Sequence, residues 1–333
     1  MARLTYILPI KSMALDAESD LAPYVRWLAQ RAETIVVDGS APEIFAAHAA
    51  EWRTTPDIDL RHVTPDADLA TVMGKVGAVL TGLRLASHEH VIIADDDVRY
   101  DDESLARVAR ALDSADVARP QNYFDPLPWH ARWDTARMLL NRLTGGDWPG
   151  TLGVRRGVLR ATGGYDGRAM FENLELVRTV IAAGGREMIL LDAFVLRRPS
   201  STRHFWSQRV RQAYDELARP VRLGLELAVL PAAVALGATG RWAALAIAAV
   251  VLVLAAEAGR RRGGGARVFP ASASLFAPAW VAERAICSWL ALGARIILGG
   301  VPYRGTVLRH AATPMRVLVR RHAAARGLRR RSA

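Results

Sequence analysis

The sequence predicts an α/β domain followed by a C-terminal helical membrane region. Short apolar runs alternate with helix-period segments up to about residue 200, which is typical of α/β folds. Two nearly uninterrupted apolar stretches follow, at 223–237 and 242–258. The formal net charge is +11, yet residues 260–333 hold fifteen arginines and one acid, so residues 1–259 are mildly acidic. This asymmetry indicates an anionic surface as the partner of the C-terminal part.

Strands are expected at 5–9, 34–37, 60–63, 91–94 and 188–191, where short apolar runs end at polar or turn residues. The segment Ser40-Ala-Pro-Glu43 is typical of a capping box with proline in the first turn, and it predicts a helix through Trp52. Apolar residues at 72, 76, 80 and 83 predict a helix before the strand at 91–94. Those at 105, 108 and 112 predict one after it.

Three consecutive carboxylates follow one of these strands, in the run His90-Val-Ile-Ile-Ala-Asp-Asp-Asp97. Open α/β sheets bind ligands at the carboxyl ends of their strands. In an extended segment Asp95 and Asp97 point to the same side, because side chains alternate with a period of two. Two such carboxylates predict a Mg²⁺ or Mn²⁺ site completed by a nucleotide diphosphate. The alternative is a solvated acidic turn whose following acids cap the next helix.

The two apolar stretches predict a transmembrane hairpin over 223–259, since about 20 residues cross a bilayer. Arginines flank both ends of this segment, which favours a cytoplasmic location for both ends. The alternative is a buried helical hairpin in a soluble core. The segment 273–299 is expected to form an interfacial or re-entrant helix, because a third crossing would carry the arginine-rich tail outside. The single Cys287 excludes an internal disulfide and fits a reducing compartment.

Six segments occur in an order that resembles the family 2 glycosyltransferases of the GT-A fold, over roughly residues 1–212. They are Thr34-Ile-Val-Val-Asp-Gly-Ser40, Gly74-Lys75, Val91-Ile-Ile-Ala-Asp-Asp-Asp97, Gly153-Val-Arg-Arg-Gly157 with Gly163-Gly-Tyr-Asp166, Phe171-Glu-Asn-Leu-Glu-Leu-Val-Arg178, and Ala183-Gly-Gly185 with Asp192-Ala-Phe-Val195.

The resemblance implies a nucleotide-diphosphate sugar as the donor. Asp38 matches the acid that reads the donor base. Asp95 and Asp97 match the Asp-x-Asp pair that holds ribose, diphosphate and metal, with Asp96 beside them in the nucleotide-binding set. Lys75 matches a basic residue near the nucleotide, although a helix-surface position is an equal alternative.

The resemblance also places the acceptor side of the site. The family's general base falls on Asn173, whose amide cannot take a proton. Glu172 is the nearest substitute, since its carboxylate can deprotonate an acceptor hydroxyl. Gln208 and Arg211 match a Gln-x-x-Arg segment that lies at the membrane surface in membrane-bound members and closes over the diphosphate. A basic amphipathic helix leading into the membrane is the alternative for this segment.

The expected organisation has six parts: a catalytic domain at 1–205, a basic amphipathic connector at 206–222, the transmembrane hairpin at 223–259, a basic linker at 260–272, the interfacial or re-entrant helix at 273–299, and a basic tail at 300–333. The expected function is metal-dependent transfer of a hexose to a lipid-linked or membrane-proximal acceptor, at the cytoplasmic membrane with the catalytic domain facing the cytoplasm. The tail is expected to contact anionic membrane lipids and no nucleic acid, because an apolar hairpin lies beside it. The alternative function is a non-enzymatic membrane-bound scaffold that binds nucleotide or lipid.

Overall fold

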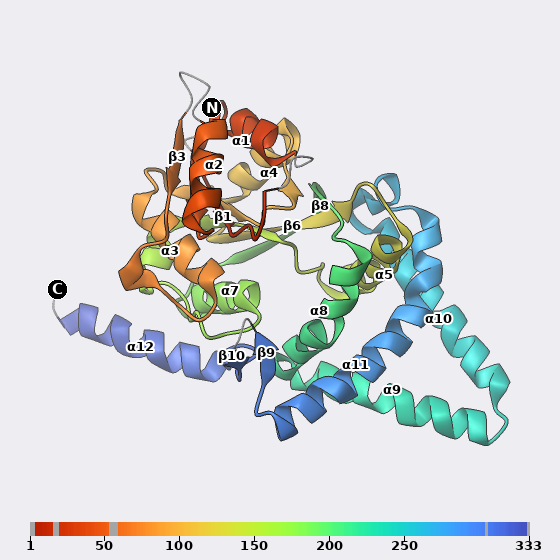
Figure 1. Ribbon diagram of the computed structural model, residues 1–333. Coiled ribbons are helices and arrows are strands. Elements are labelled where there is room, and N and C mark those ends of the chain that lie inside the picture. The colour runs from red at the N-terminus through yellow and green to blue at the C-terminus, as the bar shows by residue number, and fades with distance from the viewer. Residues whose placement is uncertain (1–3, 16–19, 53–58, 304–305, 332–333) are drawn as a thin grey trace.

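A mixed eight-stranded sheet forms the centre of the α/β domain (Figure 1). The computed structural model describes residues 4–15, 20–52, 59–303 and 306–331, with side chains left out at 306 and 324–331. The strand order is β3-β2-β1-β4-β7-β6-β8-β5. The strands are β1 (Leu4–Ile10), β2 (Glu33–Asp38), β3 (Leu60–Val63), β4 (His90–Ala94), β5 (Val98–Arg99), β6 (Val117–Phe124), β7 (Thr151–Arg155) and β8 (Glu187–Arg197).

Helices cover both faces of this sheet and enclose two apolar cores. Within the α/β domain they are α1 (Leu21–Ala29), α2 (Pro42–Trp52), α3 (Gly74–Leu85), α4 (Asp102–Ala111), α5 (Trp129–Thr144), α6 (Arg156–Ala161) and α7 (Glu172–Ala182). One core packs α3, α6 and α7 under the sheet, with Val79 and Val180 fully buried. The other packs α1 and α4 on the opposite face, with Val25 and Val108 fully buried. The apolar spacing in these helices therefore builds a three-layer α/β domain.

The five predicted strands are confirmed, and the other three strands of this sheet were not predicted. β6 has the sequence Val-Ala-Arg-Pro-Gln-Asn-Tyr-Phe, whose polar residues break the apolar pattern of a strand. The structure buries Arg119, Gln121 and Asn122 all the same, because each hydrogen-bonds to neighbouring backbone or side-chain groups. β7 pairs antiparallel with both β4 and β6, which makes the sheet mixed.

Parallel pairing of β1 with β2 and β4 brings three strand ends to one edge of the sheet. The chain leaves β1 at Lys11, β2 at Gly39 and β4 at Asp95, so these residues start the loops at that edge. The acidic run then makes a tight turn, in which the Val98 amide donates to the Asp95 carbonyl at 3.1 Å. The turn ends at β5, which pairs with the end of β8. The sheet topology thus places the carboxylates beside Arg197.

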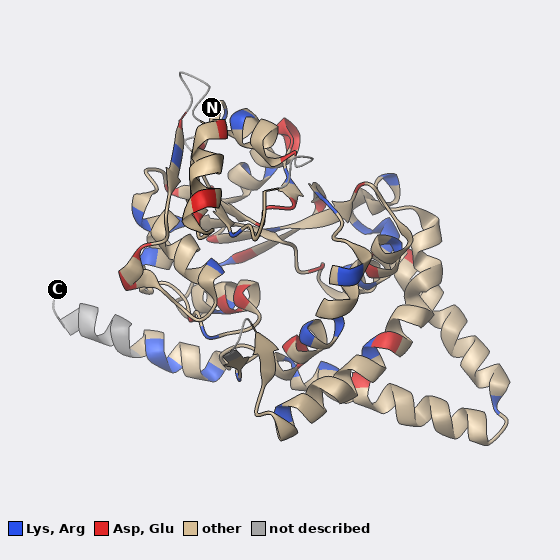
Figure 2. Cartoon of the chain, viewed as in Figure 1, with Lys and Arg blue, Asp and Glu red and all other residues tan. Residues whose placement is uncertain are grey.

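Three long apolar helices follow the α/β domain after α8 (Thr202–Tyr214). They are α9 (Pro220–Ala238), α10 (Trp242–Arg261) and α11 (Ala277–Ile297), and all three are long and apolar enough to cross a membrane. Figure 1 shows α9 and α10 diverging from a shared turn, with α11 along the third side. Figure 2 shows α9 and α10 almost free of charge along their length. The region is therefore helical and apolar, as the sequence predicts.

The third apolar helix differs from the first two in how much of it packs against protein. Within its most apolar window 44% of α11 is buried, against 6% for α9 and 11% for the α10 segment. The buried face carries Arg284 and Ser288, and Ser288 Oγ donates to Glu226 of α9 at 2.7 Å. Partial burial and a polar face distinguish α11 from a helix surrounded by lipid on all sides.

The C-terminal segment folds back onto the α/β domain. β9 (Val301–Tyr303) and β10 (Thr306–Leu308) form a two-stranded sheet, and α12 (Met315–Arg331) follows. The amides of Met170 and Phe171 donate to the carbonyls of His310 and Ala311, both at 2.8 Å. These bonds anchor the segment directly before α7. The side chains of the last arginines of the basic tail lie outside the described residues.

Candidate active site

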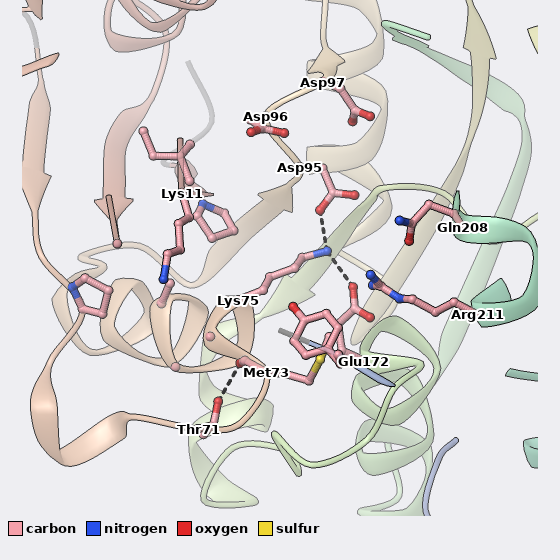
Figure 3. Close-up of a pocket in the computed structure, with 18 of the residues that line it drawn as sticks. Lys11, Thr71, Met73, Lys75, Asp95, Asp96, Asp97, Glu172, Gln208 and Arg211 are labelled. Atoms are coloured by element: carbon pink, nitrogen blue, oxygen red, sulfur yellow. Dashed lines mark hydrogen bonds and ion pairs between the residues drawn. The ribbon is translucent and has the colours of Figure 1, made fainter. Parts of the chain in front are cut away.

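A cavity of about 940 Å³ opens at the edge of the sheet where β1, β2 and β4 end. Seven of the nine site residues predicted from the sequence line it, namely Lys75, Asp95, Asp96, Asp97, Glu172, Gln208 and Arg211. They come from the loop after β4, from the first turns of α3 and α7, and from α8 (Figure 3). The fold therefore gathers residues that lie far apart in the sequence.

Lys75 lies at the centre of this arrangement. Its ammonium group forms an ion pair with Asp95 Oδ1 and donates to Glu172 Oε1 at 2.8 Å. Figure 3 shows the amine between the two carboxylates, with Arg211 reaching toward them from α8. Burial would lower the pKa of Lys75, but the charges of Asp95 and Glu172 outweigh it and raise the pKa. Lys75 is therefore a permanent cation in the cavity and not a helix-surface residue.

Arg197 is the main site residue that the sequence did not indicate. It ends β8, and its Nε lies 2.9 Å from Asp97 Oδ2 while its Nη2 lies 3.4 Å from Asp95 Oδ2. Burial raises the pKa of Asp97 and the neighbouring Asp95 raises it further, whereas Arg197 acts in the opposite direction. The pair of arginines directly after an apolar strand, at 197 and 198, was the available signal.

One carboxylate oxygen of the acidic run is available to bind a divalent cation. Asp97 Oδ1 is buried and has no hydrogen-bond partner among the described residues. Buried carboxylate oxygens are rarely left without a partner, so this atom is available as a ligand. Mg²⁺ and Mn²⁺ prefer carboxylate oxygens together with phosphate oxygens. Asp95 and Asp97 therefore suit the predicted metal, while Asp96 is exposed at the cavity wall.

Asp38 lies behind the cavity wall, where Gly39 is the lining residue. Its side chain is fully buried; Oδ1 accepts from the Ser40 amide at 2.9 Å, and Oδ2 lies 2.8 Å from His48 Nδ1 and 3.1 Å from His62 Nε2. Burial alone would raise the pKa of Asp38, but hydrogen bonds from His62, His48 and Ser40 lower it. The possible metal-ligand atoms of Asp38, His48 and His62 lie within 4.8 Å of one another. A direct role of Asp38 in reading the donor base stays a prediction.

Asn173 also lies outside the cavity lining. Its side-chain amide donates to the Pro149 carbonyl at 2.9 Å and so secures the loop before β7. Glu172, its neighbour at the start of α7, lines the cavity. Of the two residues proposed for proton transfer, only Glu172 therefore combines a carboxylate with access to the site.

A second cavity of about 290 Å³ adjoins the first and shares Asp97, Glu172, Arg197 and Arg211 with it. Asp215, at the end of α8, lines this second cavity and was not predicted as a site residue. Its Oδ1 is buried without a hydrogen-bond partner among the described residues. Burial, followed by the charge of Glu172, raises the pKa of Asp215 to about 8.

The raised pKa of Asp215 predicts a pH-dependent stability. The folded protein keeps a proton at Asp215 that the unfolded chain releases above about pH 4, so the free energy of unfolding falls as pH rises from there to about 8. Asp215→Asn removes this dependence. The melting temperature of the variant minus that of wild type is therefore expected to be larger at pH 9 than at pH 5. Thermal unfolding at both pH values measures this. Asp113→Asn, at an exposed acid, is the control; equal slopes for wild type and Asp215→Asn would contradict the prediction.

The chain is similar to known proteins in sequence and in fold. Residues 17–163 match the family model described as glycosyl transferase family 2. The chain is similar to the mannosyltransferase PcManGT from Pyrobaculum calidifontis in complex with GDP-Man and Mn²⁺, with 18% identity, coverage of 86% of this chain and 87% of that one, and a TM-score of 0.56. It also aligns with S. aureus TarS 1–349 in complex with UDP-GlcNAc, with 16% identity, 62% and 61% coverage and a TM-score of 0.43.

No sequence among the curated proteins matches the chain. The likeness to PcManGT is a likeness of fold, since the two sequences share few residues. It extends through most of both chains, beyond the segment that the family model matches. The matched segment contains β4 and the acidic turn, which carry the carboxylates of the site. Residues 17–163, which are less than half of the chain, are therefore similar to glycosyl transferase family 2, and the α/β domain has the GT-A fold.

Proposed function

We propose that the protein transfers a hexose from a nucleotide-diphosphate sugar to a lipid-linked acceptor at the cytoplasmic membrane. One observation carries the proposal: paired carboxylates, four basic side chains and an accessible Glu172 line a single cavity, and α8, which forms part of its wall, packs against the apolar helix α11. Ligand cavities commonly range from about 300 to 1,000 Å³, so a cavity of about 940 Å³ accommodates a nucleotide sugar. PcManGT, with the same fold, has been observed with GDP-Man and Mn²⁺.

In this proposal each side chain has a defined task. Asp95 and Asp97 would hold Mg²⁺ or Mn²⁺, which supplies charge neutralisation for a leaving diphosphate. Lys75 and Arg211 place positive charge in the same cavity, and a guanidinium can bind a phosphate through two hydrogen bonds. Gln208 adds an amide from α8. Glu172 accepts the proton of an acceptor hydroxyl, and Asn173 positions the neighbouring loop.

The lipid-linked acceptor is supported by the position of α8. This helix contributes His204, Gln208 and Arg211 to the cavity, and its other face packs against α11. Arg209 on that face is bonded to Glu283 of α11. An acceptor held in the membrane would therefore approach the site past α8, which links the cavity wall to α11.

The orientation at the membrane is supported by charge. Arginines lie just before and in the first turn of α9, at 219 and 222, and at and after the end of α10, at 260–262 and 267. Cytoplasmic segments carry an excess of such residues. On α12 the described side chains include Arg316, Arg320 and Arg321, and the sequence has no acid after Glu283. We infer contact of this helix with anionic lipid headgroups.

A panel of nucleotide sugars tests the proposal on the full chain in nanodiscs. A donor that binds the folded state raises the melting temperature by mass action, and the shift is expected to require Mn²⁺ or Mg²⁺ and to disappear with EDTA. The same donor, radiolabelled in its sugar, should label an extract of membrane lipids. Binding without hydrolysis or transfer would instead support a scaffold, and binding of DNA in preference to anionic vesicles would refute the lipid contact.

A further inference from the structure

The carboxylates that suit a metal already have a cation between them in this structure. The guanidinium of Arg197 bonds to Asp97 Oδ2 at 2.9 Å and lies 3.4 Å from Asp95 Oδ2. The three side chains are 23–30% exposed, so water screens the pair only in part. Lys75 pairs with the other oxygen of Asp95, but it also bonds to Glu172. Arg197 is therefore the cation that links both members of the Asp-x-Asp pair.

The backbone at Gly150 holds this arrangement in place. The Asp95 amide donates to the Gly150 carbonyl at 2.8 Å. A Cβ at position 150 would lie 2.7 Å from Asp95 Oδ2 and 3.1 Å from the Arg197 guanidinium carbon, so both groups pack directly against the glycine. The contact between Arg197 and the carboxylates is thus a packed feature of the site. It differs from a solvated surface pair, whose geometry is weakly determined.

Arg197 holds the Oδ2 atoms of both carboxylates and Lys75 holds Asp95 Oδ1, so Asp97 Oδ1 is the oxygen of the pair that has no partner among the described residues. A divalent ion that bridges Asp95 and Asp97 must therefore displace Arg197 or Lys75 from Asp95. A second cation a few ångströms from Arg197 is also repelled by it, because charges in a partly buried site interact strongly. A diphosphate changes this balance, since it offers the guanidinium another anionic partner. Arg197 lines both the large cavity and the adjoining one, so it can turn toward a diphosphate without leaving the site.

We propose that Arg197 occupies the cation position of Asp95 and Asp97 in the donor-free enzyme and yields it only when metal and diphosphate arrive together. Arg197 is thereby a positioning residue that makes metal binding depend on the donor. The inference rests on the proposed function, because it takes the metal and a nucleotide diphosphate as ligands. Its consequence is a low affinity for Mn²⁺ alone and a strong coupling between Mn²⁺ and the diphosphate.

The test measures Mn²⁺ binding to the full chain in nanodiscs by the EPR signal of free Mn²⁺, with and without GDP or UDP. Removing the competing charge in Arg197→Gln is expected to tighten the binding of Mn²⁺ alone about tenfold. The diphosphate should then tighten Mn²⁺ binding much less in the variant than in wild type. Arg198→Gln is the matched control, since its side chain pairs with Asp20 instead, and it should change Mn²⁺ affinity less than about twofold.

Arg197→Lys keeps the charge without the planar fork and is expected to fall between wild type and Arg197→Gln. It also covers the case in which Arg197→Gln does not fold. Unchanged or weaker binding of Mn²⁺ alone in Arg197→Gln would overturn the inference, while donor turnover by wild type would leave the proposed function standing. If wild type binds no Mn²⁺ even with a diphosphate and turns over no donor, both fail.

Discussion

Asp97→Asn is expected to lower kcat/KM for sugar transfer by about 1,000-fold, which corresponds to about 4 kcal/mol of lost transition-state stabilisation. The change removes one charge and leaves the shape of the side chain nearly intact. Its Oδ1 is the buried oxygen without a partner among the described residues, so the substitution acts on the atom best suited to a metal. Steady-state transfer with the donor found in the nucleotide-sugar panel measures the effect.

The control for this prediction is Asp102→Asn. Asp102 lies a few residues further on, is exposed, and pairs with Arg31 outside the cavity. It should change kcat/KM less than about twofold, because a surface ion pair contributes little. The prediction also requires that Asp97→Asn remain folded, with a melting temperature close to wild type. A folded Asp97→Asn protein with full activity would exclude a catalytic role for the acidic run.

Arg209→Ala is expected to lower the free energy of unfolding by about 3–5 kcal/mol, because it leaves buried charges without their partner. Arg209 on α8 is 1% exposed and connects two other helices. Its Nη1 lies 3.0 Å from Asp134 Oδ1 of α5, and its Nη2 lies 2.5 Å from Glu283 Oε2 of α11. The substitution therefore releases α8 from the apolar helix below it. Denaturant or thermal unfolding in nanodiscs measures the loss.

Arg203→Ala, on an exposed position of the same helix, is the matched control and should stay within about 0.5 kcal/mol of wild type. Because α8 carries Gln208 and Arg211, Arg209→Ala should also weaken binding of the donor. The double variant Arg209→Met with Glu283→Gln is expected to recover part of the stability, since it removes opposite charges together. If Arg209→Ala melts like wild type, the network does not secure α8.

The carboxylate part of the site follows from local sequence. An apolar strand with three acids at its end predicts a ligand site at the edge of a parallel sheet, and the structure places Asp95, Asp96 and Asp97 in the cavity wall. Lys75 and Glu172 were predicted from the order of short motifs, and they meet at 2.8 Å. These residues lie in the first turns of helices after glycine or turn segments, where local pattern is informative.

The partners of these residues could not be predicted in the same way. Arg197 meets Asp97 because β5 pairs with the end of β8, and such pairing depends on strand register across about a hundred residues. Val301, Pro302 and Tyr303 reach the cavity because the chain returns to it after the three apolar helices. Asp38 was predicted to face the donor, but His48 and His62 from α2 and β3 surround its carboxylate.

By itself the sequence determined the class of the catalytic domain, the acidic edge of its sheet and the apolar character of the helices that follow. These properties depend on composition and on periods of two and 3.6 residues, which can be seen within a short window. Only the tertiary structure decided which cation lies between Asp95 and Asp97, which carboxylate faces the cavity, and how α8 joins the site to α11. Those outcomes depend on contacts between distant segments, where burial makes each charge require a specific partner.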